Sequence, residues 1–206
     1  MSSSDVLLTA GLIAAAYLAG SIPFSFLVAR ARGVDLRKVG SGSIGGANVW
    51  RSSGFVPFLV AAALDILKGA LPTYAATRLL PGQPWAAVLA GLAAILGHTF
   101  SIFLKFKGGK AVATSGGVLL VIAPILIPFG IVAWVIGFLI SRMSSVGSLA
   151  AAAVVLIAGT ALFLIGRLPL PYALFVWLAV GFVVYLHRTN IQRLIAGTEN
   201  RFGKLW

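Results

Sequence analysis

Residues 112–140 read VATSGGVLLVIAPILIPFGIVAWVIGFLI, and the number of bilayer crossings in this stretch decides the fold of the chain. The stretch has no charged residue, is long for one transmembrane helix and short for two full ones, and contains Pro124 and Pro128. Proline lacks a backbone N–H and breaks or kinks a helix interior. One kinked helix and a hairpin of two short helices turning at the prolines both fit this pattern, and charges elsewhere in the chain favour the hairpin.

The whole chain has the composition of an integral membrane protein. Of its 206 residues, 60% are hydrophobic and only 10% are charged, and the mean hydropathy is +1.04. Five further apolar runs approach the roughly 20 residues that a helix needs to cross a bilayer: residues 6–29, 55–76, 85–103, 149–165 and 170–186. We therefore predict an all-α polytopic membrane bundle of seven transmembrane helices, of which the two within residues 112–140 are short.

Charged residues lie in the polar segments between these runs. With seven spans, all but three of the 16 Lys and Arg residues fall on one side of the bilayer: Arg30, Arg32, Arg37, Lys38, Arg51, Lys105, Lys107, Lys110, Arg142, Arg188, Arg193, Arg201 and Lys204. Arg78 and Arg167 lie on the other side, and Lys68 lies within a span. A single kinked helix would divide the cations more evenly, so the positive-inside rule favours seven spans, with the N-terminus outside and the C-terminus cytoplasmic.

The chain is expected to be one domain. No internal repeat and no polar linker interrupt it, so residues 1–206 are predicted to form a single membrane domain. The first five residues contain no Lys or Arg, so the first apolar run is expected to be a retained span and not a cleaved signal.

The net charge of +12 is carried by segments that bilayer-length runs separate, which argues against a nucleic-acid partner. The absence of cysteine excludes disulfides and thiolate nucleophiles.

The first polar segment is rich in glycine and serine and ends in Asn48 and Arg51. Closely spaced glycines from Gly40 to Gly46 free the backbone to point successive N–H groups at one anion. Ser41 and Ser43 add hydroxyl donors, and Arg51 adds a guanidinium. The segment therefore predicts a phosphate site, and the alternative is a flexible linker.

The second segment, residues 97–114, pairs lysines with glycines before an apolar helix. Lys107 and Lys110 flank Gly108 and Gly109, so N–H groups, the helix dipole and lysine charge are predicted to converge at a helix N-terminus. A positive anchor at the membrane surface is the alternative, which explains the lysines but not the glycine pair.

Two further polar segments and one buried pair complete the pattern. Residues 142–148 contain serines that either bind a ligand or cap the next helix. His187, Asn190 and Arg193 share one face if the last span continues, and a lipid-binding surface helix is the alternative. Asp65 and Lys68, spaced i and i+3 in the second span, are expected to form an ion pair that holds the bundle, in preference to a catalytic role.

In order along the chain, these segments resemble the bacterial acyl-phosphate:glycerol-3-phosphate acyltransferases of the PlsY type. The resemblance runs nearly end to end. It rests on Gly20-Ser21-Ile22-Pro23, the Gly-Ser-Gly loop ending in Asn48 and Arg51, Asp65 with Lys68-Gly69, Gly97-His98 followed by Phe106-Lys107-Gly108-Gly109-Lys110, Ser145 with Ser148, and His187-Arg188 with Asn190, Arg193 and Gly197-Thr198-Glu199.

The resemblance implies an enzymatic function. A fatty acyl group would pass from acyl phosphate, and not from a thioester, to the sn-1 hydroxyl of glycerol 3-phosphate, giving lysophosphatidic acid and phosphate in the first acylation of phospholipid synthesis. The enzyme would be a multi-pass protein of the bacterial cytoplasmic (inner) membrane, in contact with membrane lipids, with its active site facing the cytoplasm. No cofactor and no metal ion are expected.

The residues that match the family's motifs give the expected site. The catalytic residues are expected to be Ser41, Arg51, Lys110, Ser148, His187 and Asn190, of which the first four hold phosphate and the last two orient glycerol 3-phosphate. Substrate-binding residues are expected at Gly40, Gly42, Ser43, Asn48, His98, Lys107, Gly108, Gly109, Ser145, Arg188, Arg193 and Glu199. The chain departs from the family pattern at Ser43, Ala47, Ser101 and Ala111, where Asn, Thr, Pro and Gly are usual. We expect the start of a helix to tolerate Ala111.

The expected chemistry needs little from the protein beyond positioning and charge. Phosphate is a good leaving group, so no covalent acyl-enzyme is expected. His187, His98 and a substrate phosphate remain alternative proton acceptors. The His-x4-Asp dyad of other glycerolipid acyltransferases is excluded because Phe103 and Gln192 stand where the Asp would be.

An anion transporter and a lipid-binding anchor are the competing classes of protein. A transporter would place polar residues along a midplane path, and an anchor would not need the glycine pairs.

Overall fold

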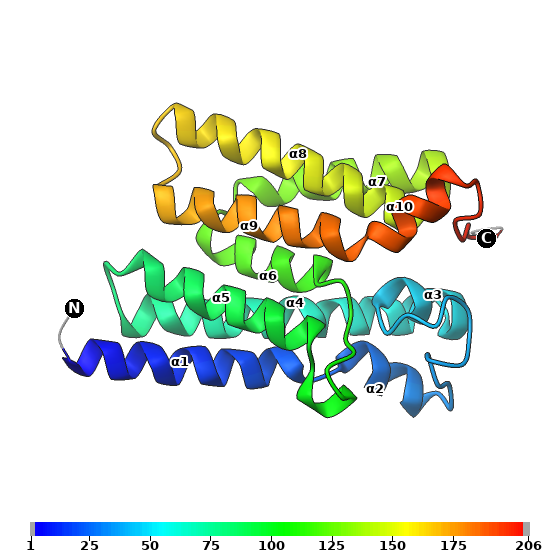
Figure 1. Cartoon of the computed structure of the whole chain (residues 1–206), viewed down its shortest axis with the longest axis horizontal. Helices are drawn as coiled ribbons and strands as arrows, with labels where there is room; N and C mark the ends of the chain where they lie inside the picture. Colours follow the sequence, from blue (N-terminus) through cyan, green and yellow to red (C-terminus); the bar gives the residue numbers. More distant parts are fainter. Residues whose placement is uncertain (1–2, 204–206) are drawn as a thin grey trace. The chain divides into compact units, whose positions relative to one another are not determined.

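The computed structural model describes residues 3–203, and each regular element in that range is a helix. The elements are α1 (Ser3–Ser21), α2 (Phe24–Ala31), α3 (Gly46–Ser53), α4 (Phe55–Leu79), α5 (Pro84–Thr99), the 3-10 helix η1 (Ile102–Leu104), α6 (Val112–Ile122), α7 (Leu126–Ser141), α8 (Ser144–Leu164), α9 (Leu170–Leu186) and α10 (Arg188–Ile195). They group into two compact units: unit 1 ends at Ile122 and unit 2 begins at Ala123 (Figure 1). The all-α prediction is confirmed, and Lys204 lies outside the described residues.

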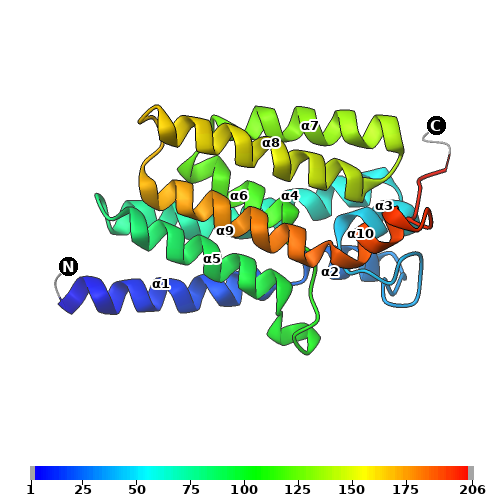
Figure 2. The same cartoon turned by 45° about the horizontal axis from the view of Figure 1, so that its top comes forward.

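Unit 1 is built on close helix pairs. Both views show α1 running alongside α5, and α4 also packs on α5 and α6 (Figures 1 and 2). A Cβ on Gly20 of α1 would collide with the Ala94 carbonyl of α5, and a Cβ on Gly97 of α5 would collide with the Tyr17 carbonyl of α1. Helix pairs in membranes depend on such close backbone approach because lipid gives apolar burial little driving force.

The pair formed by α4 and α6 uses glycine in the same way. A Cβ on Gly69 would meet the Thr114 carbonyl, and a Cβ on Gly117 would meet the Ile66 carbonyl. Only 11 residues long, α6 is thereby held at backbone contact with a much longer partner.

The first apolar run contains a break that the sequence analysis missed. We predicted one continuous helix over residues 6–29, but α1 ends at Ser21 and α2 begins at Phe24. Pro23 causes the break because it has no N–H to donate and disfavours helical geometry at Ile22. The two helices together still form one candidate span, Ser3–Ala31.

Residues 112–140 form two short helices, as predicted, but the position of the break differs from the prediction. The helix α6 ends at Ile122 and α7 begins at Leu126. Of the two prolines, only Pro124 therefore lies between the helices. Pro128 lies in the first turn of α7, where its missing N–H has no intrahelical partner to lose. A turn at both prolines is therefore wrong.

Unit 2 contains α7 to α10. Both views show α7 and α8 side by side, α8 also packs on α9, and α10 contacts α9 after a bend of 55° (Figures 1 and 2). The helix α8 starts at Ser144, before the predicted start at residue 149, and Met143 occupies its N-cap without a capping side chain. The serines therefore lie within the first turns, and the alternative that they cap the helix is wrong.

The lengths of the helices fit a membrane protein. Among residues 3–203, four segments are long and apolar enough to cross a bilayer: Ser3–Ala31, Phe55–Leu79, Pro84–Leu104 and Ser144–Leu164. The bent pair of α9 and α10 gives a fifth if it counts as one span, and α6 and α7 are shorter apolar helices. Large apolar side chains such as Leu7, Val56 and Ile157 stay exposed on these helices, which is typical of surfaces that contact lipid.

Candidate active site

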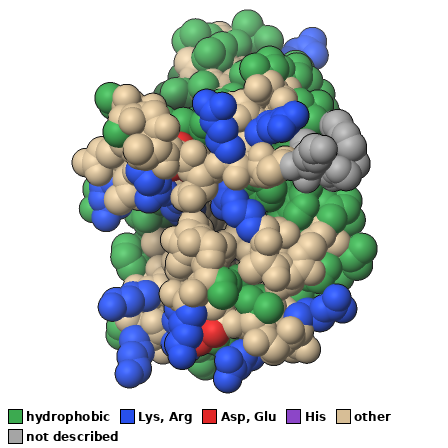
Figure 3. Space-filling model, turned by 90° about the vertical axis from the view of Figure 1, so that its right-hand side faces the viewer, with side chains coloured by type: hydrophobic (Ala, Val, Ile, Leu, Met, Phe, Trp, Pro, Cys, Tyr) green, Lys and Arg blue, Asp and Glu red, His purple; other side chains and the backbone are tan. Residues whose placement is uncertain are grey.

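Within each unit, the polar segments gather at one end. In unit 1, the segment between α2 and α3 lies at the same end as the segment between α5 and α6, and Lys and Arg side chains stand on this face among polar atoms (Figures 1 and 3). The opposite end is marked by Gln83, whose Nε2 donates to Asp5 Oδ2 at 3.3 Å. In unit 2, the Phe202 N–H donates to the Arg142 carbonyl at 2.8 Å, so the chain after α10 meets the end of α7.

The single acidic side chain of the first polar segment is neutralised locally. Arg37 donates to Asp35 Oδ1 from Nε at 2.9 Å and to Oδ2 from Nη2 at 2.7 Å. These hydrogen bonds hold the pKa of Asp35 well below its usual range. The Arg37 guanidinium also lies 5.1 Å from the centre of the Phe26 ring, so it ties the segment to α2.

The side chain of Asn48 fixes the glycine-serine loop through hydrogen bonds to its backbone. Its carboxamide is buried, donates to the carbonyls of Leu36, Val39 and Ser43 at 2.9 to 3.1 Å, and accepts from the Ser41 N–H at 3.1 Å. Gly40 has φ +57°, and a Cβ there would collide with Asn48 Oδ1. The side chain predicted to bind substrate therefore faces the loop backbone, and its observed role is to fix the loop.

The loop N–H groups are less available to an anion than the sequence suggested. The Ser41 N–H bonds Asn48, and the Gly42 N–H donates to the Val39 carbonyl at 3.0 Å. The prediction that successive N–H groups of this loop converge on one anion is therefore wrong at these two positions. The hydroxyls of Ser41 and Ser43 remain, and α3 starts at Gly46 without a capping side chain.

Arg51 is carried on α3, one turn after Asn48, and is half-buried. This short helix is anchored by Trp50, whose ring stacks on Phe58 of α4 with centroids 5.0 Å apart. Gly54, with φ +97°, separates α3 from α4. Arg51 is therefore presented by a short helix that two contacts hold in place, the Asn48 hydrogen bonds to the loop and the aromatic contact of Trp50 with α4.

The glycine pair serves close packing instead of open N–H donation. The Gly108 N–H donates to the Thr99 carbonyl at 2.8 Å, and the Gly109 N–H donates to the His98 carbonyl at 3.1 Å. A Cβ on Gly108 would collide with the His98 carbonyl, and a Cβ on Gly109 would collide with Nε2 of the His98 ring. The prediction that these N–H groups face an anion is wrong, because the end of α5 already uses them.

Lys110 follows the pair and precedes α6 by one residue, Ala111. Ala111 has φ +56°, in the left-handed region that glycine tolerates far better than alanine. It lies before the helix and not within it, so the expectation that a helix start tolerates Ala111 is wrong about the geometry. Lys107 is exposed, whereas Lys110 is half-buried near the first turn of α6.

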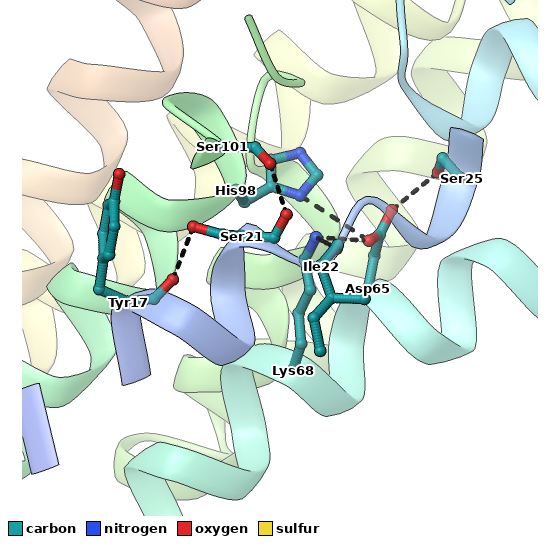
Figure 4. A network of polar contacts seen from close by, with 8 residues as sticks. All are labelled: Tyr17, Ser21, Ile22, Ser25, Asp65, Lys68, His98 and Ser101. Carbon is teal, nitrogen blue, oxygen red and sulfur yellow. Dashed lines mark hydrogen bonds and ion pairs between the residues drawn. The ribbon is translucent and has the colours of Figure 1, made fainter. Parts of the chain in front are cut away.

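A buried ionic cluster lies beneath this segment. Lys68 Nζ is 2.9 Å from Asp65 Oδ1, which confirms the predicted ion pair, and Nδ1 of His98 is 3.8 Å from the same oxygen (Figure 4). Ser25 of α2 donates to Asp65 Oδ2 at 2.8 Å. The sequence analysis missed Ser25, because nothing in the spacing of residues links α2 to α4.

The same region satisfies the carbonyls that the α1–α2 break exposes. Lys68 Nζ donates to the Ile22 carbonyl at 2.8 Å, and Ser101 Oγ donates to the Ser21 carbonyl at 2.5 Å (Figure 4). Unpaired carbonyls are costly in a membrane, so these donors stabilise the break. Ser101, one of the departures from the family pattern, makes a bond here that proline could not.

In unit 2, three of the predicted residues donate to the carboxylate of a fourth, Glu199. Glu199 accepts from Asn190 Nδ2 at 2.7 Å, Arg193 Nε at 2.8 Å and Ser145 Oγ at 2.9 Å. Burial raises the pKa of Glu199, but the hydrogen bonds from Arg193, Asn190 and Ser145 lower it by more, so the net pKa lies below the ordinary value of 4.5. The structure therefore brings these four residues together, and Glu199 joins the segment after α10 to α8 and α10.

His187, Ser148 and Arg188, the other predicted residues of unit 2, differ in burial and in hydrogen-bond partners. His187 is buried at the bend, and its Nδ1 donates to the Val183 carbonyl at 2.8 Å, because a carbonyl oxygen can only accept. Ser148 is buried and donates to the Ser144 carbonyl. Arg188 is exposed and stacks on Tyr185 at 4.4 Å. The last span does not continue straight, because α9 and α10 meet at a bend of 55°, but His187 is the N-cap of α10 and the spacing of His187, Asn190 and Arg193 is kept within that helix.

Among the described residues, no three His, Asp or Glu side chains are grouped closely enough to hold a metal ion. The predicted site residues of the two units carry guanidinium, ammonium, hydroxyl, amide and imidazole groups. Such donors suit phosphate-bearing ligands.

The sequence is closely related to known proteins over nearly its whole length. The profile of the family described as glycerol-3-phosphate acyltransferase matches residues 10–197. The glycerol-3-phosphate acyltransferase of Roseiflexus sp. (strain RS-1) is 59% identical over 195 residues, covering 95% of this chain and 96% of that protein. That of Myxococcus xanthus (strain DK1622) is 45% identical over 200 residues, covering 95% and 100%.

The fold is also similar to a solved structure. PlsY (YgiH), an integral membrane glycerol 3-phosphate acyltransferase, matches in its glycerol 3-phosphate form with a TM-score of 0.88 and 38% identity, covering 96% of each chain. Its lysophosphatidic acid form matches with a TM-score of 0.86 and 36% identity, again covering 96% of each chain.

Proposed function

The chain belongs to the PlsY-type family of glycerol-3-phosphate acyltransferases, and we propose that it transfers a fatty acyl group from acyl phosphate to the sn-1 hydroxyl of glycerol 3-phosphate. The products are lysophosphatidic acid and inorganic phosphate. The observation that carries the proposal is the match over residues 10–197, which runs through both units and includes Ser41, Arg51, Lys110, Ser148, His187 and Asn190. For the same reason we propose that the two units belong to one acyltransferase domain.

The proposed chemistry is a direct transfer. The sn-1 hydroxyl oxygen attacks the acyl carbonyl carbon, the bond from that carbon to the phosphate oxygen breaks, and phosphate departs with the electron pair. The hydroxyl proton passes to a basic group. No covalent acyl-enzyme forms, because the leaving group already departs readily and the protein mainly orients the reactants and neutralises their charge.

The proposed roles follow the predicted site residues. In unit 1, Ser41, Arg51 and Lys110 hold phosphate through hydroxyl, guanidinium and ammonium groups. In unit 2, Ser148 adds a hydroxyl, and His187 and Asn190 orient glycerol 3-phosphate. The bond of His187 Nδ1 to the Val183 carbonyl fixes the orientation of the ring, which supports its role in orienting the substrate. Asn48 and the glycine pair support these residues by fixing the loops.

We also propose a topology of seven spans in the bacterial cytoplasmic membrane, with the N-terminus outside and the C-terminus and active site facing the cytoplasm. The four candidate spans, the bent pair of α9 and α10 as a fifth, and the two shorter apolar helices α6 and α7 support this count. The gathering of cations at one end of each unit supports the orientation through the positive-inside rule.

The activity is tested with the purified protein in lipid nanodiscs. With acyl phosphate and glycerol 3-phosphate, phosphate and lysophosphatidic acid should form in equal amounts, and acyl-CoA should not replace acyl phosphate. Product formed only from the thioester would overturn the proposed donor. Solute flux without either product would overturn the enzymatic function.

The proposed phosphate residues are tested against a cation at the other end of unit 1. Lys110→Ala and Arg51→Ala should each lower kcat/KM by about 100-fold or more, because each removes a charge from bound phosphate. Arg78→Ala should leave kcat/KM nearly unchanged. Equal losses in all three variants would contradict a site at one end.

A further inference from the structure

Asp65, Lys68 and His98 form a buried cluster next to the glycine pair, and packing alone does not explain why ionisable side chains are buried there. Asp65, Lys68 and His98 are 3%, 5% and 9% exposed, and they come from two candidate spans, α4 and α5. A buried ion pair is often no more stabilising than apolar residues of the same volume, and ionisable groups inside a membrane usually have a functional role. The role of this cluster is indicated by what its members contact.

The Asp65 carboxylate joins three elements. Oδ2 accepts from Ser25 of α2, and Oδ1 faces both Lys68 Nζ at 2.9 Å and His98 Nδ1 at 3.8 Å (Figure 4). Nδ1 makes no hydrogen bond among the described residues, so Asp65 acts on the His98 ring through its charge. Lys68 is held in turn by the Ile22 carbonyl. The carboxylate and the ammonium are both fixed in place by groups outside their own helix.

The other side of the His98 ring contacts the segment that carries Lys110. Its Nε2 edge lies where a Cβ of Gly109 would be, so ring and backbone are in direct contact. The Gly109 N–H also donates to the His98 carbonyl, and Lys110 is the next residue. A rotation of the ring would therefore displace the backbone next to Lys110.

We propose that Asp65 and Lys68 are positioning residues for acyl transfer. Their fixed charges orient the His98 ring, the ring supports Gly109, and Lys110 is thereby held where it binds a substrate phosphate. The inference rests on the proposed function for the identity of that ligand. It differs from a role in holding the bundle, because it links the pair to one substrate contact.

Kinetics of a paired substitution test the proposal. Asp65→Asn alone leaves Lys68 as an unpaired buried charge and destabilises the fold, whereas Asp65→Asn with Lys68→Met removes both charges at similar volume. Lys110→Ala should raise the KM of the substrate whose phosphate Lys110 binds. In the paired variant, the same KM should rise about tenfold or more, because even a small displacement of a binding group weakens substrate binding by that factor. Thr73→Val, a buried polar substitution on the same helix α4, should leave that KM unchanged.

A coupling measurement decides whether the pair acts through Lys110. Adding Lys110→Ala to the paired variant should raise that KM almost no further, since both changes remove the same contact with the substrate phosphate. Losses that multiply would overturn the proposal. If the paired variant does not fold, Ser25→Ala keeps both charges and loses one bond to Asp65, and it should raise the same KM less strongly. An unchanged KM in Ser25→Ala would also overturn the proposal.

A spectroscopic measurement separates this proposal from the proposed function. The chain has no cysteine, so a spin label on Lys105→Cys reports only the motion of the segment before Lys110. The label should become more mobile in the paired variant, while a label on Arg78→Cys, at the far end of α4, should not change. Unchanged mobility at residue 105 would overturn the positioning role even if acyl transfer is confirmed. Absence of acyl transfer in the unsubstituted protein would overturn the proposed function alone.

Discussion

Glu199 shows how one side chain organises several others. Its carboxylate takes hydrogen bonds from Ser145, Asn190 and Arg193, which lie on two helices. A buried carboxylate with three donors is stable only in its charged form, and its partners lose their shared acceptor if it is removed or protonated. The arrangement of Asn190, a proposed substrate ligand, therefore depends on the ionisation of a residue that need not contact substrate.

The pH dependence of stability tests this dependence. Because the folded-state pKa of Glu199 is lowered from 4.5, its contribution to stability is complete above about pH 4.5 and is lost as the pH falls through the lower folded-state value. Glu199→Gln should cost about 2 kcal/mol at neutral pH and should flatten the fall in unfolding midpoint between pH 7 and pH 3. Glutamine can still accept from one donor, so the expected loss is partial. An unchanged midpoint and an unchanged acid profile would contradict the structure at this carboxylate.

Ala111 gives a second test on a single residue. An alanine with φ +56° is strained, so Ala111→Gly should raise the free energy of unfolding by about 1 kcal/mol. Ala113→Gly, two residues later inside α6, should lower it by about 1 kcal/mol, because glycine is unfavourable within a helix. Thermal midpoints in one detergent, measured side by side, should shift in opposite directions. Parallel shifts would show that Ala111 is not left-handed.

Helix positions could largely be predicted from the sequence, but the ends of the helices could not. Apolar runs near 20 residues long identify α4, α5 and α9 because bilayer thickness sets their length. The break before Pro23 was not predicted because the donors that stabilise it, Lys68 of α4 and Ser101 between α5 and η1, lie far from it in the sequence. The early start of α8 escaped it because serine is compatible with a cap and with a first turn alike.

The site was predicted by residue type more successfully than by role. The glycine-rich sequence predicts open N–H groups. At Gly40, Gly108 and Gly109, however, glycine is required because another group occupies the place of its Cβ. The sequence shows that a side chain is missing but not what fills its place, and that partner decides between anion binding and close packing.

The pairing of α1 with α5 predicts which glycines are essential. Gly97→Val should prevent stable folding, because its Cβ would collide with the Tyr17 carbonyl and neither backbone can move away without separating the helices. Gly11→Ala, on the same α1 helix but with no atom within 4 Å of its Cβ, should be neutral or slightly stabilising. Recovery of monodisperse protein after gel filtration measures both. Normal recovery of Gly97→Val would contradict this packing.

For the whole molecule, charge placement and helix length have to agree. In unit 1, Arg78 lies at the end opposite to the basic loops, and in unit 2, Arg167 lies between α8 and α9, away from Arg142. Seven spans put both exceptions outside the cell. A chain with one crossing in place of α6 and α7 would keep Arg78 outside, but it would put Arg167 inside and the C-terminal cations outside.

The absence of cysteine allows this difference to be measured directly. Single cysteines replacing the exposed residues Lys38, Arg78, Arg167 and Arg201 would be reacted with a membrane-impermeant maleimide in intact cells and after permeabilisation. Residues 78 and 167 should react in intact cells, and residues 38 and 201 only after permeabilisation, because the positive-inside rule keeps the basic ends in the cytoplasm. The unsubstituted chain is the control and should not react. Reaction at residue 201 in intact cells, with protection at residue 167, would show that α6 and α7 cross the membrane only once between them.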